Sequence, residues 1–186
     1  MAQARKVELP LSDRILRELR AGDNLLLTGT MCAARDVAHK RIVEALQQGK
    51  SLPFDIKGAA IYYMGPSPAR PGRLIGSAGP TTSARMDTYT PCLIAAGLKA
   101  MIGKGPRAKE VKDALVQHGA VYLGAVGGAG ALLSQSIKKS VVVAYDELGP
   151  EAIRLLEVED FPVTVINDIY GGDLYEEGKA RYRIKP

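Results

Sequence analysis

Apolar residues recur along the chain with two periods, one typical of helices and one typical of strands. Between residues 34 and 48, Ala38, Ile42, Ala45 and Leu46 form an apolar face at helical spacing, and Gly49 is placed to end that helix. Similar patterns predict helices over residues 12–22, 91–96, 107–118, 130–136 and 150–156. Short apolar runs predict strands over residues 24–31, 59–64, 74–78, 100–102, 120–123, 140–145 and 162–167.

The order of these elements indicates the fold class. Strands and helices alternate along much of the chain, which is typical of an α/β domain whose sheet is at least partly parallel. The loop at residues 65–72, which holds three prolines, separates two predicted strands, and this hairpin-like pair suggests a second, antiparallel element. There is no internal repeat, low-complexity tract or interdomain linker, so we expect residues 1–186 to form a single domain.

The composition excludes several classes of protein. With 46% hydrophobic and 24% charged residues, the chain of 186 residues resembles a folded domain rather than a disordered one. Cys32 and Cys92 are too few for a disulfide framework or a four-thiolate metal site, which indicates a reducing compartment. The first residues hold no apolar stretch of signal-peptide length, so we expect a cytoplasmic protein. Residues 119–137 are uncharged, but their five glycines and polar end disfavour a membrane span.

The charge balance narrows the range of partners. The formal net charge is +5, from 25 Lys and Arg against 20 Asp and Glu. A positive charge suits nucleic acid, an anionic membrane surface or small anionic substrates. Here the charges are dispersed, and no aromatic residues stand between basic ones as they do on a base-stacking surface. This distribution favours individual Arg and Lys side chains in specific sites, and we expect no binding to nucleic acid.

The chain lacks most standard motifs for catalysis and cofactor binding. It contains no HExxH, CxxC, GxSxG or GxxxxGK[ST] pattern. With only His39 and His118, it cannot build a histidine-rich metal site. Residues 124–130 have the spacing GxxGGxG rather than the GxGxxG of dinucleotide sites, so we expect a tight turn that allows a close backbone approach.

Three predicted strand ends each carry one cation, and the first two cations are Arg35 and Lys104. Arg35 begins the best-defined helix, where a positive charge gains nothing from the helix dipole. It is therefore a candidate for carboxylate recognition, or else for an ion pair with Asp36 or another acid. Lys104 lies between two glycines after the strand at residues 100–102, and it is either an ordinary loop lysine or a residue that a ligand can approach.

A third cation lies in the most informative stretch, residues 79–87. Thr81, Thr82 and Ser83 stand where a helix or turn begins, and backbone N–H groups there can hold an anion together with Arg85. The alternative is a plain N-cap with one surface arginine. Arginines grip carboxylates through paired hydrogen bonds and a lysine adds a point charge, so the three cations suit a small dicarboxylate.

At these residues the chain resembles a known family. GPTTSxRM is the specific element of the resemblance, which runs from about residue 9 to residue 182. The family is the β subunit of class I, iron–sulfur-dependent fumarate hydratase, together with the β subunit of L-tartrate dehydratase. The matching segments, in the same order and spacing, are TGTMCAARDVAHKR (28–41), GPTTSARMD (79–87), IGKG (102–105) and VGGAGAL (126–132).

The resemblance implies an architecture and a partner. The expected fold is a three-layer β/β/α domain of the swivelling type with a mainly parallel central sheet. A cysteine-rich α subunit would hold a 4Fe-4S cluster and join this chain in an α2β2-type hetero-oligomer. Cys32 and Cys92 are too few to hold such a cluster alone, so we expect no metal ligands in this chain.

The resemblance also implies a reaction, the reversible hydration of fumarate to L-malate. The family's substrate residues fall on Arg35, Thr81, Arg85 and Lys104, and an open iron of the partner's cluster would act as a Lewis acid. Thr81 is the expected catalytic base, although a hydroxyl needs an acidic neighbour for that role. Thr82, one residue away, is a further substrate-binding residue and a second candidate for the base.

Alternatives to this function are an L-tartrate dehydratase β subunit, a non-catalytic module that binds anions or nucleic acid, and a scaffold that only covers a partner's cluster. Two other residues inside the matching motifs are expected to be structural. His39 would lie inside its helix, and Asp87 would support Arg85 or the loop.

Overall fold

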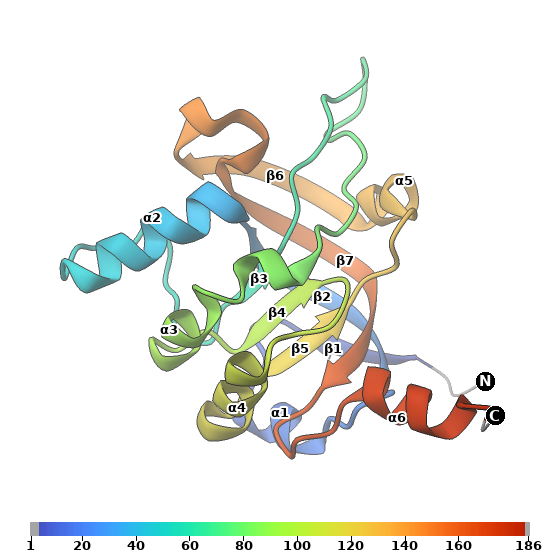
Figure 1. Cartoon of the computed structure of the whole chain (residues 1–186). Coiled ribbons are helices and arrows are strands. Elements are labelled where there is room, and N and C mark those ends of the chain that lie inside the picture. Colours follow the sequence, from blue (N-terminus) through green and yellow to red (C-terminus); the bar gives the residue numbers. More distant parts are fainter. Residues whose placement is uncertain (1–3, 185–186) are drawn as a thin grey trace.

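Seven strands form one mixed sheet in the computed structural model, which describes residues 4–184 (Figure 1). The sheet has the order β1-β2-β3-β4-β5-β7-β6. The first five strands of this order pair in parallel, whereas β7 pairs antiparallel with β5 and β6. The strands are β1 (Arg5–Glu8), β2 (Asn24–Ala33), β3 (Ala60–Tyr62), β4 (Ala100–Gly103), β5 (Val121–Gly124), β6 (Ile137–Ala144) and β7 (Ile153–Asn167).

The 15-residue strand β7 closes this sheet on itself. It pairs antiparallel with β2 from Arg154 to Thr164, and its last residues pair with β5. Strands β2, β3, β4, β5 and β7 therefore form a closed ring, with β1 and β6 attached outside it. The predicted α/β class with a partly parallel sheet is confirmed, and the sheet as a whole is mixed.

Helices lie mainly on one side of this ring. Figure 1 shows α2, α3 and α4 side by side next to β3 and β4, with α1 and α6 at the opposite end of the molecule from α5. The α-helices are α1 (Asp13–Glu18), α2 (Asp36–Gln47), α3 (Thr90–Ala95), α4 (Lys109–His118), α5 (Gly130–Leu133) and α6 (Leu174–Tyr182). Three short 3-10 helices are η1 (Ser83–Met86), η2 (Ser134–Ser136) and η3 (Asp146–Glu151).

Alternate residues of the strands face two separate cores. Tyr62 and Ile102 belong to one buried cluster together with Phe161 of β7. Their sequence neighbours Ile61 and Met101 belong to the second cluster, which also contains residues of α2, α3 and α4. Because successive side chains of a strand point to opposite faces, the first cluster fills the ring and the second lies between the ring and these helices.

Local sequence signals place most of the predicted elements correctly. The hydroxyl of Ser12 accepts a hydrogen bond from the backbone N–H of Ile15 and so caps α1 as expected. Gly119 ends α4 with a φ of 62°, a left-handed conformation that glycine adopts without strain. The apolar pattern does not predict β1 or α6, because β1 buries only Val7 and α6 buries no residue.

The predicted strand at residues 74–78 is wrong, and with it the antiparallel hairpin. This segment is irregular, and its long loop projects from the molecule (Figure 1). Ser67 donates its backbone N–H to the carbonyl of Ser77, and the N–H of Ser77 donates to the Ser67 hydroxyl. A Cβ at Gly76 would lie 2.2 Å from the carbonyl oxygen of Ser67. The two sides of the loop therefore meet through turn-like contacts at Gly76. Among the described residues of these two sides, Met64 and Pro80 pair as an isolated bridge.

The predicted helix at residues 150–156 is also wrong. The 3-10 helix η3 ends at Glu151, and β7 begins at Ile153. From Arg154 onward, the backbone of β7 pairs with β2 on one side and β6 on the other. These two neighbours, distant in the sequence, satisfy the backbone hydrogen bonds in a strand, so tertiary pairing decides the conformation here.

The uncharged stretch at residues 119–137 folds into β5, a glycine-rich turn, α5 and η2. Within residues 4–184, none of the helices combines the length and the apolar character needed to cross a membrane.

His39 of α2 makes the stability of the fold depend on pH. Its ring is fully buried, lies edge-on to Tyr63 with 5.1 Å between ring centroids, and has no hydrogen-bond partner on either nitrogen among the described residues. Burial, aided by the charge of Arg107, lowers the pKa of His39 to about 3. The unfolded chain takes up this proton below a pKa of about 6.5. Stability is therefore full above that pH and is lost as the pH falls toward the folded-state pKa.

We expect His39→Phe to keep the stability near neutral pH and to remove part of its decline in acid. The slope of the unfolding free energy should fall by up to about 1.4 kcal/mol per pH unit below roughly pH 6.5. Urea unfolding at several pH values measures this slope, with the half-buried His118→Gln as the control. An unchanged slope in His39→Phe would contradict the neutral, buried state of His39.

Candidate functional site

The carboxyl ends of four parallel strands meet at one edge of the ring. Arg35 follows β2, and Lys104 directly follows β4. Between them, the N–H of Thr81 donates to the carbonyl of Tyr63, just after β3, at 2.7 Å. The strand order β2-β3-β4 thus brings the three cation-bearing segments to neighbouring positions. The segment with Arg85 follows the irregular residues 74–78 and not the strand expected there.

Backbone hydrogen bonds join Thr81 and Ser83 to Lys104. The N–H of Lys104 donates to the carbonyl of Thr81 at 3.3 Å, and the N–H of Ser83 donates to the carbonyl of Lys104 at 2.9 Å. Thr82 and Lys104 therefore form a parallel bridge. A Cβ at Gly103 would lie 2.0 Å from Oγ of Ser83, so only glycine allows the segments to approach this closely.

The hydroxyls of this segment do not form the plain N-cap that was the alternative. Thr82 occupies the N-cap position of η1 but makes no capping hydrogen bond with its side chain, and it is exposed. The Ser83 hydroxyl instead lies 2.8 Å from the hydroxyl of Tyr122 in the interior. Thr81 is half-buried. The Thr82 hydroxyl is thus not used by the helix start.

Arg35 and Arg85 meet at a single carboxylate. Nη2 of Arg85 donates to Oδ2 of Asp36 at 2.7 Å, and Nε of Arg35 lies 3.9 Å from the same oxygen. Nη2 of Arg35 also lies 3.5 Å from Oε1 of Glu151. The ion pair expected as an alternative for Arg35 is therefore present, and its acid also binds Arg85.

The two guanidinium groups differ in how much of their surface is open. The Arg85 side chain is 54% exposed and that of Arg35 is 24% exposed. Nε of Arg35 is buried without a hydrogen-bond partner among the described residues. A Cβ at Gly65 would lie 2.7 Å from this Nε, so the missing side chain there makes room for the guanidinium. An unpartnered buried N–H is costly, so the fold holds Arg35 in place at some expense of stability.

Beneath the edge lies a buried cation that sequence reasoning missed. Arg107 is 5% exposed; its Nε donates to Oδ1 of Asp87 at 2.7 Å and its Nη2 to the Thr90 hydroxyl at 2.8 Å. Its guanidinium also lies 4.9 Å from the centre of the Tyr122 ring and 5.4 Å from that of Tyr63. Burial alone would lower the pKa of Arg107, but Tyr63 and Asp87 outweigh it and raise the pKa.

Asp87 is structural as expected, and of its two expected roles it supports the loop rather than Arg85. It binds Arg107 rather than Arg85, and its Oδ2 accepts from the N–H of Ala108 at 2.8 Å. A signal for this pair exists in the sequence. Arg107 stands at the predicted start of a helix, the same unfavourable position that singles out Arg35.

The glycine-rich turn packs against the site rather than standing alone. The N–H of Ala78 donates to the carbonyl of Gly130 at 3.0 Å, and a Cβ at Gly130 would lie 2.4 Å from Oγ of Ser77. A Cβ at Gly127 would lie 3.4 Å from Cδ of Lys104. These contacts are the close backbone approach that the sequence predicts for the turn.

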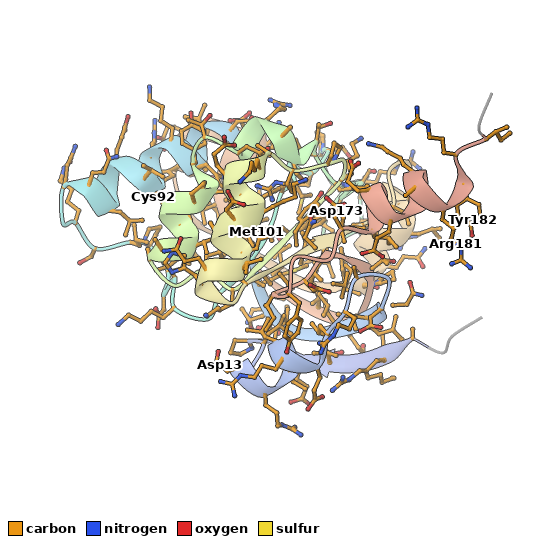
Figure 2. All side chains as sticks on the ribbon, turned by 60° about the horizontal axis from the view of Figure 1, so that its bottom comes forward. Asp13, Cys92, Met101, Asp173, Arg181 and Tyr182 are labelled. Carbon is orange, nitrogen blue, oxygen red and sulfur yellow. The ribbon has the colours of Figure 1, made fainter. Side chains whose placement is uncertain are left out.

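The two cysteines lie on separate elements. Cys32 is buried in β2, where burial raises the pKa of its thiol to about 12, and Cys92 lies on α3 (Figure 2). Across residues 4–184, no three His, Cys, Asp or Glu side chains gather closely enough to hold a metal ion. A four-iron cluster takes several thiolates, so the residues of this chain do not fit one.

A cleft of about 520 Å³ lies between the projecting loop and the segment from Ala131 to Ile137. Its lining includes Ser67, Arg70, Arg73 and Gln135. None of the five predicted site residues lines this cleft. They lie on an open edge of the molecule, where Arg85 and Thr82 are exposed.

Comparison with known proteins bears on the identity of the chain. The family model described as Fumarase C-terminus matches residues 1–178. The class I anaerobic fumarate hydratase of Escherichia coli is 43% identical over 181 residues, and fumarate hydratase 2 of Leishmania major is 42% identical over 167. A Methanocaldococcus jannaschii protein provisionally named L(+)-tartrate dehydratase subunit beta is 40% identical over 173 residues.

The share of each relative that is covered differs. The matches take in 94%, 89% and 90% of this chain, respectively. The chain spans about a third of the length of the two fumarate hydratases, at 33% and 29%, but 89% of the tartrate dehydratase subunit. The resemblance drawn from the sequence motifs is confirmed, and the chain belongs to the Fumarase C-terminus family.

Proposed function

We propose that this chain is the substrate-binding β subunit of an iron–sulfur hydro-lyase that interconverts fumarate and L-malate. The observation that carries the proposal is the meeting of Arg35 and Arg85 at one carboxylate, on the same edge as Thr81 and Lys104. This arrangement supports recognition of a small molecule with two carboxylates. The names of the relatives, fumarate hydratases and a tartrate dehydratase subunit, support the same class of substrate.

Each cation has a separate role in this proposal. Arg85, with an exposed guanidinium, would bind one substrate carboxylate through paired hydrogen bonds, and the partly exposed Arg35 side chain would bind the other. Lys104 would add a point charge. Negative charge develops on the substrate when the proton leaves C3, and donors already held in place stabilise that charge more than they stabilise the ground state.

Thr81 is the proposed base, with Thr82 as a substrate-binding residue and a second candidate for the base. The half-buried Thr81 is fixed on both sides by backbone hydrogen bonds, to Tyr63 and Lys104, whereas Thr82 is exposed. A threonine hydroxyl removes a proton only if an acidic group accepts its own. We propose that the partner subunit supplies that group.

The partner is a cysteine-rich α subunit that carries the 4Fe-4S cluster. Cys32 and Cys92 do not fit a cluster, and the site residues form an open edge that a second surface could cover. The fumarate hydratase relatives have about two thirds of their length outside the match, which is room for such a part. We propose a cytoplasmic α2β2-type assembly in which residues 1–186 form one domain of the swivelling type.

L-Tartrate is the second candidate substrate, because this chain covers 89% of the length of the tartrate dehydratase subunit. The same cations would bind its two carboxylates. The turnover of malate and tartrate by the reconstituted complex distinguishes the two.

The chain purified alone should be colourless and inactive, because its cysteines cannot hold a cluster. It should become active on malate when it is combined with a cysteine-rich partner under reducing, oxygen-free conditions. The visible absorbance of the purified chain tests for a cluster, and an assay of fumarate formation from malate measures the activity with and without the partner. Turnover by the chain alone would contradict the subunit proposal, and steep salt-dependent binding of DNA or RNA would favour the nucleic-acid alternative.

Replacing Arg85 by Ala should reduce kcat/KM of the complex on malate, because one carboxylate loses its charged donor. We expect a loss of about 3 kcal/mol in transition-state binding. The matched control is Arg14→Ala, which removes an exposed arginine from a loose ion pair on α1. Turnover of Arg85→Ala equal to that of the control would favour a scaffold that only covers the partner's cluster.

Thr81→Val and Thr82→Val should differ if Thr81 is the base. Both changes remove a hydroxyl at nearly constant volume. We expect Thr81→Val to lower kcat by about a hundredfold or more, and Thr82→Val to act mainly on KM. Steady-state kinetics on malate measure the difference. The reverse pattern would assign the base to Thr82.

A further inference from the structure

Asp36 stands between the two arginines of the site. Its Oδ2 accepts from Nη2 of Arg85 at 2.7 Å and lies 3.9 Å from Nε of Arg35. Arg85 and Asp36 are 49 positions apart in the sequence, so the contact joins the segment after β3 to the start of α2. The carboxylate is itself largely covered, with 17% of its side chain exposed.

The backbone of Asp36 is held in an unusual conformation. Its φ is 36°, in the left-handed region that residues other than glycine rarely adopt. The N–H of Asp36 points at Sδ of Met86, at 3.5 Å, and the next N–H, of Val37, donates to Oε2 of Glu151 at 3.1 Å. Contacts on both sides therefore fix this turn. Conformations of this kind persist where the surrounding structure over-determines them, and they cluster at functional sites.

The contact uses only one edge of the Arg85 guanidinium. A guanidinium carries five N–H donors in a fixed plane. Within residues 4–184, the bond to Asp36 is the hydrogen bond that the Arg85 side chain makes, and about half of that side chain remains exposed. The other edge of the guanidinium is therefore open to a ligand.

Stability alone is a weak reason for this arrangement. An ion pair to a half-exposed arginine contributes little to folding. A left-handed backbone at an aspartate opposes that small gain with a cost of its own. Orientation of a reacting group, in contrast, is worth large factors in rate.

We propose that Asp36 is a positioning residue that orients Arg85, and with it Arg35, toward the substrate carboxylates. The proposal rests on the proposed function of this site. The short side chain, fixed at the start of α2, cannot follow Arg85 outward. It holds one edge of the guanidinium still while the other edge binds a ligand, and its negative charge offsets part of the positive charge of the cation pair.

The first test is steady-state kinetics of Asp36→Asn in the reconstituted complex with malate. This change keeps the shape but removes the charge. We expect kcat to fall by about tenfold to a hundredfold, because the charge-assisted hydrogen bond to Arg85 is lost. KM should stay equal or decrease, because the site gains one net positive charge for a dianionic substrate.

The matched control is Asp113→Asn, which breaks an exposed ion pair with Lys109 on α4. Its kinetics should equal those of the unchanged protein. A kcat for Asp36→Asn within twofold of the control would overturn the proposal. So would a fall in kcat that matches the loss of folded protein in thermal unfolding, because that would be a purely structural effect.

A second measurement does not depend on turnover. Nitrogen-15 NMR of the full chain reports how fast the Arg85 guanidinium rotates about its Nε–Cζ bond. We expect slow rotation in the unchanged chain and faster rotation in Asp36→Asn, with the signals of Arg14 unaffected. Equal rotation in both chains would overturn the positioning role. A complex that fails to turn over malate while this contrast persists would instead overturn the proposed function.

Discussion

The buried ion pair between Arg107 and Asp87 is the contact on which the strand-end edge depends. A charge in the interior must be paired, and removing one partner of such a pair typically costs about 3–5 kcal/mol. Arg107 lies beyond β4, whereas Asp87 and Thr90 follow η1. The pair therefore ties the segment that carries Arg85 to the one that carries Lys104, with the Arg107 side chain fully buried.

Closure of the sheet by β7 sets where these segments stand. β7 pairs with both β2 and β5. The four parallel strands from β2 to β5 therefore form a continuous arc with their carboxyl ends on one edge. Along that arc, Arg35 comes first, the segment with Thr81 and Arg85 second, and Lys104 third. Glycines at positions 65 and 103 let these groups come closer than any side chain would allow.

The result is an edge with rigid support below and an open face above. Its arginines are held by carboxylates of the chain itself, Asp36 and Glu151, yet Arg85 keeps half of its surface exposed. A site that binds substrate carboxylates needs donors that are held in place and that still have N–H groups free for the ligand. The proposed hydro-lyase function needs in addition a cluster and an acidic neighbour for Thr81, and the open face is where a partner subunit could bring both.

The sequence by itself determined the features that depend on local spacing. Helix α2, the cap at Ser12, the alternation of strands and helices, and the candidacy of Arg35, Thr81, Arg85 and Lys104 all follow from residues close together in the chain. Only the tertiary structure decided that residues 153–156 extend as part of β7 and that residues 74–78 stay irregular. It also decided that Asp36 binds Arg85 and that Asp87 binds Arg107. These outcomes rest on partners far apart in sequence, because backbone groups and buried charges bind whatever the completed fold places beside them.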